Sequence, residues 1–387
     1  MSKLHTLLIV FLVSSICSAQ IIIEKPTYLR FPKDSVLVNT LTTSLDNLFS
    51  NLNEDKGLDQ FLMQDQIVLT TKTLNVIKGY HKQFKGDSTK IVSHQLSNVY
   101  SIASESSKIV INGFLSRPQK SPTLLYSITL IAKEAKEGFK FSIPLKIETE
   151  NWKIKKIGNI TYHYRNDLNV NRANLFNEKN THIANKFGLK PETLTMYMCN
   201  NYQEILQLRG VNYSVNDNGL YRDGYGVVDT TIFSLMHNED FSHDMLHYYS
   251  GKVNKSEDRN WIAEEGLAYL WGNAYYTDAF GEMITQKRLV LALKKHLKQH
   301  SNMSLLQLFK EDTKLFNHIA SEVSVRSVLA AIIANEVTLQ KGSKGILELI
   351  NAGREDRLRN FLKATNQLIG LNENNFNKKV SRLLLDF

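Results

Sequence analysis

Two histidines and a glutamate mark the stretch of this sequence that could do chemistry. His243 and His247 are four residues apart, and Glu265 follows 18 residues after the second histidine. On a helix, residues four apart stand on one face, about 6 Å apart along the axis, so both imidazoles can reach one metal ion. A glutamate from a second helix would supply a third ligand and leave one tetrahedral position open for water. This spacing predicts a catalytic zinc site.

The residues around Glu265 strengthen that prediction. The segment 261–268 reads Trp-Ile-Ala-Glu-Glu-Gly-Leu-Ala, so Glu265 must lie among apolar and small side chains. A buried carboxylate without a partner is strongly unfavourable, and a zinc ion held by both histidines would supply the missing charge. We expect Gly266 to let the two ligand-bearing helices approach closely. Glu264 would point about 100° away around the helix, and we expect it to be solvated.

The pattern HDMLH followed by WIAEEGLAYLWG resembles that of a known family. It is similar to the gluzincin metallopeptidases, specifically the peptidase MA-like group, whose motif is HExxH followed by a W-x-x-E-G-x-A segment. The resemblance covers about residues 157–387. It implies zinc as the cofactor, with His243, His247 and Glu265 as its ligands, and hydrolysis of peptide bonds in a peptide or protein substrate by zinc-activated water. The Gly-x-Met-Glu-Asn motif of the aminopeptidase branch is absent from the sequence, so nothing indicates recognition of a free N-terminus.

Asp244 is the first departure from the family pattern, which has a glutamate at this position as the catalytic base. An aspartate is one methylene shorter, which withdraws the carboxylate by roughly 1.5 Å against a working hydrogen-bond range of about 2.6–3.2 Å. Asp244 could act through an intervening water or a small shift of the helix, or it could fail as a base. A carboxylate is also favourable in the first turn of a helix for purely structural reasons. Asp244 is the candidate catalytic residue.

The second departure concerns the group that would stabilise the oxyanion. The family typically uses a tyrosine or histidine well downstream of the glutamate ligand, but the sequence has no tyrosine after Tyr276. His318 and Arg326 lie in about the right region, and His296 and His300 are weaker candidates; each is more often a surface residue. Loss of both the base and this group would remove factors of about 10²–10⁴ and 10²–10³ in rate.

Three hypotheses follow from these features. The first is an exported zinc-dependent metallopeptidase-like hydrolase with Asp244 as an imperfect base. The second is a catalytically impaired zinc-binding pseudopeptidase that binds peptides or a partner protein. The third is an exported protein without a metal, in which the histidine pair is a chance match among 11 histidines and the N-terminal module does the work. Ligand atoms on one zinc lie about 2.0–2.3 Å from the ion, so a separation above about 8 Å between the imidazoles and Glu265 would favour the third.

The elements that position these residues can be predicted from apolar spacing. Apolar residues three and four apart predict helices over 38–52 and 66–84, and alternation from residue 90 predicts antiparallel strands up to about residue 143. We therefore expect an α+β protein whose N-terminal module, residues 20–155, combines helices with a curved antiparallel sheet. This arrangement resembles the cone-shaped nuclear-transport-factor-2-like modules, which are as often docking platforms as enzymes.

Residues 156–387 are expected to form the peptidase-like domain, a small sheet followed by a mainly helical C-terminal half. The predicted strands include 159–164, 193–198 and a β-branched run over 227–235, which could offer its edge to a peptide or lie inside the sheet. The predicted helices of this domain are 170–187, 201–208, 241–250, 260–275, 279–299, 304–310, 320–338, 343–351 and 355–366.

Composition limits the classes of partner. The chain has 387 residues, of which 42% are hydrophobic, an ordinary value for a globular protein. Its net charge of +9 is spread over single lysines and arginines, without a basic block interleaved with aromatic residues. We therefore expect no nucleic-acid partner.

The N-terminal residues predict export. Residues 1–19 read as a signal peptide, with Lys3, an apolar run over 7–13 and a small-residue cleavage site. The run is too short to span a bilayer, and no later stretch is long enough, so we expect no integral membrane segment. After cleavage one cysteine remains, Cys199, which excludes an internal disulfide and is expected to be a buried, inert thiol. A periplasmic or secreted location is predicted.

Overall fold

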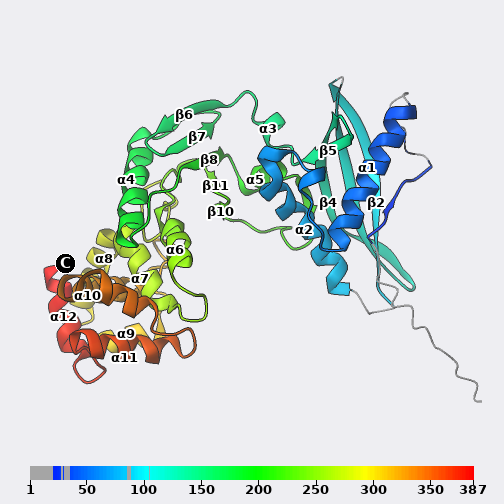
Figure 1. The fold of residues 1–387 in the computed structure, drawn as a ribbon. Coiled ribbons are helices and arrows are strands. Elements are labelled where there is room, and N and C mark those ends of the chain that lie inside the picture. The colour runs from blue at the N-terminus through cyan, green and yellow to red at the C-terminus, as the bar shows by residue number, and fades with distance from the viewer. Residues whose placement is uncertain (1–20, 28, 30–34, 85–88, 104) are drawn as a thin grey trace, which may run out of the picture. The chain divides into compact units, whose positions relative to one another are not determined.

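The chain folds into two compact units in the computed structural model (Figure 1). The first unit runs to Ile147 and also contains Leu206–Leu220, and the second comprises Glu148–Ile205 and Tyr221–Phe387. The division at Ile147 falls a little before the boundary expected after residue 155. The predicted signal peptide lies outside the described residues. The residues that the structure describes are 21–27, 29, 35–84, 89–103 and 105–387.

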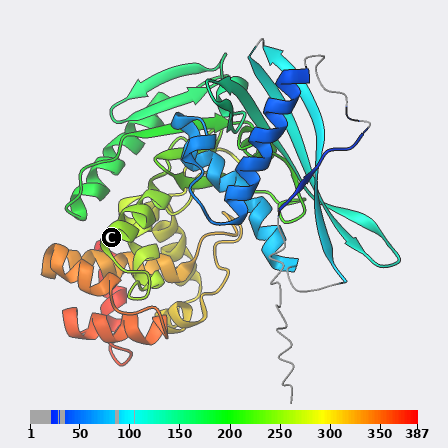
Figure 2. The same ribbon diagram turned by 45° about the vertical axis from the view of Figure 1, so that its right-hand side comes forward.

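The first unit combines a sheet with the helices α1 and α2, which lie against it (Figures 1 and 2). The strand order is β1-β2-β3-β4-β5, and β9 pairs with β4. Neighbouring strands are antiparallel except β1 and β2. The elements are β1 (Ile23–Glu24), α1 (Ser35–Asn53), the 3₁₀ turns η1 (Asp59–Phe61) and η2 (Gln64–Gln66), α2 (Ile67–Phe84), β2 (Ile91–Ala103), β3 (Ser106–Arg117), β4 (Lys120–Ala135), β5 (Gly138–Ser142) and β9 (Val211–Ser214).

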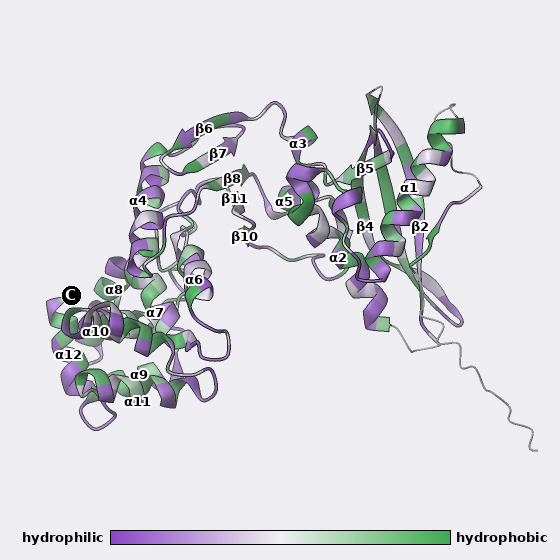
Figure 3. Ribbon diagram, viewed as in Figure 1, coloured by the Kyte–Doolittle hydropathy of each residue, from purple (hydrophilic) through white to green (hydrophobic). Residues whose placement is uncertain are grey.

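The predicted helices and strands of this unit are confirmed, and their apolar spacing explains the packing. The apolar residues of α1 recur three and four apart and are buried, so one face of the helix is hydrophobic while the other is polar (Figure 3). On β3 the buried residues alternate, with Ile109 and Ile111 inside. The buried apolar residues of α1 are Leu41, Leu45, Leu48, Phe49 and Leu52.

A segment from later in the chain completes the first sheet, which the sequence did not predict. β9 pairs antiparallel with β4. Gly210, just before it, has a φ of 78°, and a Cβ there would lie 2.4 Å from the Thr129 carbonyl oxygen, so a side chain does not fit. The Thr73 hydroxyl donates to the Arg209 carbonyl at 2.8 Å. A four-residue strand carries too little pattern to reveal such a distant pairing.

The sheet of the second unit has the strand order β10-β11-β8-β7-β6. Its strands are β6 (Lys153–Ile157), β7 (Ile160–Tyr164), β8 (Leu194–Cys199), β10 (Gly224–Val228) and β11 (Thr231–Leu235). β7, β8 and β11 run parallel, and the two edge strands pair antiparallel with their neighbours. The single strand predicted over 227–235 is wrong, because Asp229 and Thr230 both adopt positive φ (47° and 63°) and form a tight hairpin turn. β11 is therefore interior and β10 is the edge.

Helices make up most of the remaining second unit, and the predicted α+β class is confirmed. No helix of the described chain is long and apolar enough to cross a membrane. The helices are α4 (Val170–Lys186), α6 (Ser242–Val253), α7 (Trp261–Trp271), α8 (Gln286–Gln299), α9 (Leu305–Glu311), α10 (Val325–Ile350), α11 (Arg357–Ile369) and α12 (Phe376–Asp386). The short helices α3 (Leu145–Glu148) and α5 (Tyr202–Leu208) lie where the chain passes from one unit to the other.

Several predicted helix boundaries are wrong. α7 ends at Trp271 rather than at residue 275, and α8 begins at Gln286 rather than at 279, so Tyr275 and Tyr276 lie in a loop. The helices predicted over 320–338 and 343–351 join as α10 across a kink at Gly342, whose φ is 62°. α12 was not predicted. The apolar spacing continued past the true end of α7, and the tyrosines there looked like another helical turn.

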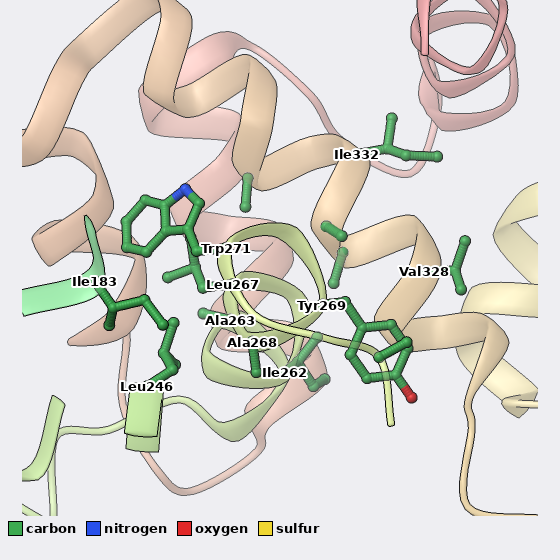
Figure 4. Packing of buried hydrophobic residues seen from close by; sticks show 14 of the residues in the cluster. Ile183, Leu246, Ile262, Ala263, Leu267, Ala268, Tyr269, Trp271, Val328 and Ile332 are labelled. Carbon is green, nitrogen blue, oxygen red and sulfur yellow. The ribbon is translucent and has the colours of Figure 1, made fainter. Parts of the chain in front are cut away.

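α7 lies at the centre of the second unit. Its apolar residues other than Trp261 and Leu270 are buried, with Leu246 of α6 on one side and Val328 and Ile332 of α10 on the other (Figure 4). Gly266 permits the closest of these approaches, because a Cβ there would lie 2.7 Å from the backbone carbonyl carbon of Ala330. α10 therefore fixes the position of α7, which carries the predicted glutamate ligand.

Candidate metal centre

α6 places His243 and His247 on one face, with ring centroids 5.2 Å apart. The helix begins one residue before the first histidine. There the Ser242 N–H donates to the Asp240 carboxylate at 3.0 Å, and Lys179 donates to the other oxygen of that carboxylate at 2.8 Å. A carboxylate at a helix N-terminus is favourable because the free N–H groups carry partial positive charge. This anchoring fixes the direction in which both imidazoles point.

Asn260 fixes the start of α7 and thereby the position of Glu265. Its side-chain oxygen accepts hydrogen bonds from two N–H groups of the first turn, at 3.1 and 3.3 Å. That is the usual arrangement of an N-cap residue. Its amide nitrogen donates to the carbonyls of Gly353 (3.2 Å) and Arg357 (2.8 Å). The beginning of α7 is therefore tied to the segment between α10 and α11.

The three predicted ligands converge. Nε2 of His243 lies 3.6 Å from one oxygen of Glu265, and Nε2 of His247 lies 3.1 Å from the other. One ligand atom from each side chain lies within 4.8 Å of the other two. Within the described part of the chain, this is the one group of three or more His, Cys, Asp and Glu side chains with that geometry. These separations are far below the 8 Å that would have favoured a protein without a metal.

The donor set fits a zinc ion, since two imidazole nitrogens and one carboxylate oxygen are ligands that zinc accepts. Both ring nitrogens of His247 are buried, and neither makes a well-aligned hydrogen bond to a described residue. Buried polar atoms without such a partner are rare in proteins. A cation shared by His247 and Glu265 would give one of these nitrogens the partner that it lacks.

The electrostatics of the cluster also suit a cation. Burial alone would lower the pKa of His247, but close contacts with the Glu264 and Glu265 carboxylates outweigh it and raise that pKa to about 9. Burial opposes ionisation of Glu265, yet the contact with His247 and the charge of His243 hold its pKa below the usual value. The surroundings therefore favour one positive charge between two carboxylates, and either an imidazolium or a metal ion can supply it.

Each histidine also has a contact on its other nitrogen. Nδ1 of His243 lies 2.9 Å from the Asn273 carbonyl oxygen, and Nδ1 of His247 lies 3.5 Å from Glu264. Such outer contacts orient metal-binding imidazoles and select the tautomer that leaves Nε2 free for the metal. The Trp261 ring stacks on His247, with centroids 4.6 Å apart and an interplanar angle of 7°. The Asn273 contact could not be predicted from the sequence, because any residue can supply a backbone carbonyl.

Glu264 is not solvated, contrary to the prediction. Its side chain is fully buried and accepts hydrogen bonds from Arg259 at 2.7 and 2.8 Å and from Ser250. Burial opposes its ionisation, but His247, Arg259 and Ser250 together lower its pKa to about 2. The angle around the helix was predicted correctly, but this side of α7 faces α6 and Arg259 rather than water. Glu264 is therefore the charged outer partner of His247.

The close approach of the ligand-bearing helices depends on Gly272 rather than on Gly266. A Cβ at Gly266 would meet α10, whereas a Cβ at Gly272 would lie 2.9 Å from the carbonyl carbon of Ser242 and 3.0 Å from the backbone nitrogen of His243. Gly272 caps α7 with a φ of −106° and a ψ of −130°. The end of α7 can therefore abut the start of α6, next to the first ligand.

Asp244, the predicted base, lies in the first turn of α6 and has a specific partner. The Tyr276 hydroxyl donates to Oδ2 of Asp244 at 2.7 Å. Burial and the neighbouring Asp244 charge raise the pKa of Tyr276 well above its usual value, so the hydroxyl stays protonated and remains a donor. Tyr276 lies in the loop after α7, and this loop brings it to the site.

The other candidates from the sequence do not join this cluster. His318 is exposed, and the rings of His296 and His300 contact each other in a tilted arrangement, with centroids 4.4 Å apart. The Arg326 guanidinium donates a hydrogen bond to the Phe309 carbonyl at 2.8 Å, which holds it against the helix α9. Arg326 also lines a pocket that contains Glu265. Cys199 is fully buried, and burial raises the pKa of its thiol, as expected for an inert cysteine.

Comparison with known proteins adds nothing to this geometry. No protein-family model matches the chain, and no curated protein matches it with a significant score. The resemblance to the gluzincins therefore rests on the motif residues themselves and on the arrangement in which the structure holds them.

Proposed function

We propose that this chain is an exported zinc-dependent metallopeptidase-like hydrolase. The convergence of His243, His247 and Glu265 is the observation that carries the proposal. Two further observations support the proposal. Nδ1 of each histidine lies next to an oxygen atom, of Asn273 for His243 and of Glu264 for His247, and Asp244 directly follows His243 in the sequence. The similarity of HDMLH and WIAEEGLA to the gluzincin motifs points to the same chemistry. Export is proposed on the signal-peptide pattern of residues 1–19.

The residues of the site divide the work as follows. When bound, a zinc ion supplies Lewis-acid chemistry, polarising a carbonyl and lowering the pKa of a water molecule to about 7. Asp244 accepts the proton from that water and later returns it to the leaving amine. The Tyr276 hydroxyl holds Oδ2 of Asp244, while Oδ1 accepts no hydrogen bond from any described residue and remains available. Tyr276 thus acts as a positioning residue for a base with a short side chain.

The strand β10 supports a peptide as the substrate. It is an edge strand of the second sheet, and its neighbour β11 leads through a short segment into α6. An extended peptide can add to such an edge through backbone hydrogen bonds, whatever its side chains. We therefore propose that the peptide lies along β10, which shares only Val227 and Val228 with the 227–235 run.

A second candidate function is a zinc-binding pseudopeptidase that binds a peptide or partner protein without cleaving it. The hydrogen bond between Tyr276 and Asp244 favours it, because it takes up one oxygen of a carboxylate that is already a methylene short of the usual glutamate. The ligand set is the same for both candidates, so only turnover separates them.

Zinc content tests the metal site. The purified full chain is expected to hold one zinc per molecule, and His247→Ala is expected to lose it. His296→Ala is the matched control, because His296 is also a helical histidine but lies outside the cluster, and it should retain the metal. Equal zinc in the wild type and in His247→Ala, measured by mass spectrometry of the metal after dialysis, would show that the cluster is not a metal site.

Turnover tests the choice between the two candidates. The zinc-loaded wild type should cleave an unstructured protein substrate, Asp244→Asn should lower the rate by about 10²-fold or more, and Asp244→Glu should retain or raise it. A wild type that holds zinc but shows no cleavage, together with an active Asp244→Glu variant, would establish the pseudopeptidase.

A further inference from the structure

Two pockets meet at Trp261, close to the candidate metal ligands. The first, the metal-side pocket, has a volume of about 470 Å³, and Glu265 and Tyr269 are part of its lining. The second, the arginine pocket, has a volume of about 350 Å³. Trp261 and Arg357 line both pockets. The arginine pocket is lined by Ser256, Arg259, Trp261, Glu264, Arg354 and Arg357.

The arginine pocket has unbalanced positive charge. Three guanidinium groups line it against one carboxylate, Glu264, and Arg259 alone pairs with that carboxylate. Neither Arg354 nor Arg357 forms an ion pair with any described carboxylate. Arg357 uses Nε to donate to the Arg354 carbonyl at 3.3 Å, and its two terminal nitrogens make no hydrogen bond to a described residue. Guanidinium groups with free donors are well suited to a planar anion such as a carboxylate.

The charge of the metal-side pocket is different. Asp312, Glu322 and Asp356 are part of its lining, and Arg326 is already close to Asp312 at 3.6 Å. Four carboxylates, counting Glu265, line this pocket with two guanidinium groups, those of Arg326 and Arg357, so it is less favourable for a carboxylate than the arginine pocket. The two pockets therefore differ in their balance of charge.

The arginine pocket lies one layer of side chains from the ligands. Trp261 stacks on His247, and Glu264 contacts both His247 and Arg259. Consecutive Cα atoms of a peptide are 3.8 Å apart, so a carboxylate one or two residues from a reacting carbonyl lies roughly 4–8 Å from it. Because Arg357 lines both the arginine pocket and the pocket that contains Glu265, a substrate in the metal-side pocket can present a carboxylate to Arg357.

We propose that Arg354 and Arg357 bind a carboxylate of the substrate, either a free C-terminus or an acidic side chain, close to the bond that is hydrolysed. This inference rests on the proposed peptidase function and names a substrate class for it: peptides with a negative charge next to the scissile bond. Trp261, which also lines both pockets, offers a flat apolar surface to the intervening residue.

Binding of matched peptides to the full chain tests the inference. The probes are acetyl-tetra-alanine with a free C-terminus, its C-terminal amide, and an amide in which the last residue is glutamate. Quenching of tryptophan fluorescence gives each dissociation constant, with the protein metal-free and zinc-loaded. At least one acidic probe is expected to bind about tenfold or more tightly than the neutral amide, because hydrogen bonds to a charged carboxylate are stronger than those to a neutral amide. The acidic probe that binds more tightly identifies the source of the carboxylate.

The variants assign the preference to the pocket. Arg357→Gln and the double variant Arg354→Gln with Arg357→Gln should reduce the acid preference to near one. Arg359→Gln is the control, because Arg359 is an exposed arginine on the same helix that lines neither pocket, and it should keep the preference. In the wild type the preference for the acidic probes should also shrink as the salt concentration rises from about 0.05 to about 0.5 M, because this rise shortens the screening length roughly threefold. Equal binding of all three probes to the wild type, or a preference that survives the double variant, overturns the inference.

This design separates the inference from the proposed function. A protein that holds zinc and cleaves peptides but shows no acid preference refutes the inference alone. A protein that holds no zinc but shows an acid preference lost in Arg357→Gln refutes the proposed function while the carboxylate site stands.

Discussion

Each unit of this protein buries a histidine, and the two histidines lie in opposite electrostatic surroundings. In the first unit His94 is 2% exposed, and its Nδ1 lies 2.5 Å from the hydroxyl of Tyr126. Burial, helped by the neighbouring His81, lowers the pKa of His94 to about 4. In the second unit His247 lies between two carboxylates and has a pKa raised to about 9.

The difference shows what turns a buried histidine into a candidate ligand. Burial alone produces a neutral imidazole whose neighbours are a phenol and another histidine, as at His94. At His247 the carboxylates of Glu264 and Glu265 favour a positive charge, and the imidazole of His243 also lies close to Glu265. Counter-charge and convergence, rather than burial, distinguish the candidate metal centre.

Removal of the outer carboxylate should have the largest effect. Glu264→Ala would leave Arg259 without its partner and His247 without its outer contact, so we expect a loss of about 3–5 kcal/mol in the free energy of unfolding. Urea unfolding of the metal-free chain, followed by tryptophan fluorescence, gives this value. Glu257→Ala, at an exposed glutamate in the preceding loop, should change stability by less than about 0.5 kcal/mol. Similar small losses for both variants would mean that Glu264 is not the buried counter-charge of this region.

Acid should destabilise the first unit through His94. Its folded pKa of about 4 lies below the ordinary value of 6.5, so the unfolded chain binds the proton first as pH falls. The contribution of the neutral His94 side chain to the free energy of unfolding is fully present above about pH 6.5. It is lost between about pH 6.5 and 4, by about 3 kcal/mol in total. The protein is unfolded in urea at each pH and then given a hydrogen-exchange pulse at one fixed pH. Exchange in peptides from β2 and β3 reports the unfolding of the first unit alone.

His94→Gln is the control for that titration, because glutamine can still contact Tyr126 but cannot bind a proton. The variant should lose less stability than the wild type over the same pH interval. An identical decline in both proteins would assign the acid sensitivity to other groups and remove the contrast with His247.

Gly266→Ala should disturb the packing that holds Glu265 in place. The new Cβ would lie 2.7 and 2.9 Å from backbone atoms of Ala330 and Ala331, so α7 and α10 must separate. Such overpacking costs about 1–3 kcal/mol, and zinc affinity should fall with it because Glu265 moves. Gly226→Ala, where a Cβ would meet nothing within 4 Å, should leave zinc affinity unchanged in the same competition assay with a chelator.

Tyr276→Phe should have the smallest effect on stability. It removes the hydrogen bond to Asp244 and leaves the ring in place, so we expect a loss of about 0.5–1.5 kcal/mol and an unchanged zinc content. The same variant informs on the base. If Tyr276 positions Asp244, the turnover number should fall while KM for the peptide stays constant; a raised KM with an unchanged turnover number would contradict that role.

The sequence predicted the ligand set because its signals are local. The four-residue spacing of His243 and His247 places both on one helical face wherever the helix lies, and Glu265 was singled out by its apolar neighbours. The helices and strands of the first unit followed from periodicity for the same reason. Each of these features can be predicted from a short run of consecutive residues.

The outer part of the site could not be predicted from local patterns. Whether Glu264 faces water or Arg259 depends on what packs against its side of α7. The contact between Tyr276 and Asp244 depends on where α7 ends, and apolar spacing misplaced that end. β9 joined the sheet of the first unit through a pairing more than 80 residues away in sequence.

Sequence alone therefore determined which side chains could bind a metal and on which elements they lie, because helical geometry is set by neighbours along the chain. Tertiary structure decided that Gly272 rather than Gly266 brings the ligand helices together, that Glu264 is the counter-charge of His247, and that Asp244 has a tyrosine partner. Those outcomes depend on close packing between segments distant in sequence, and close packing leaves no repeating pattern for a sequence to display.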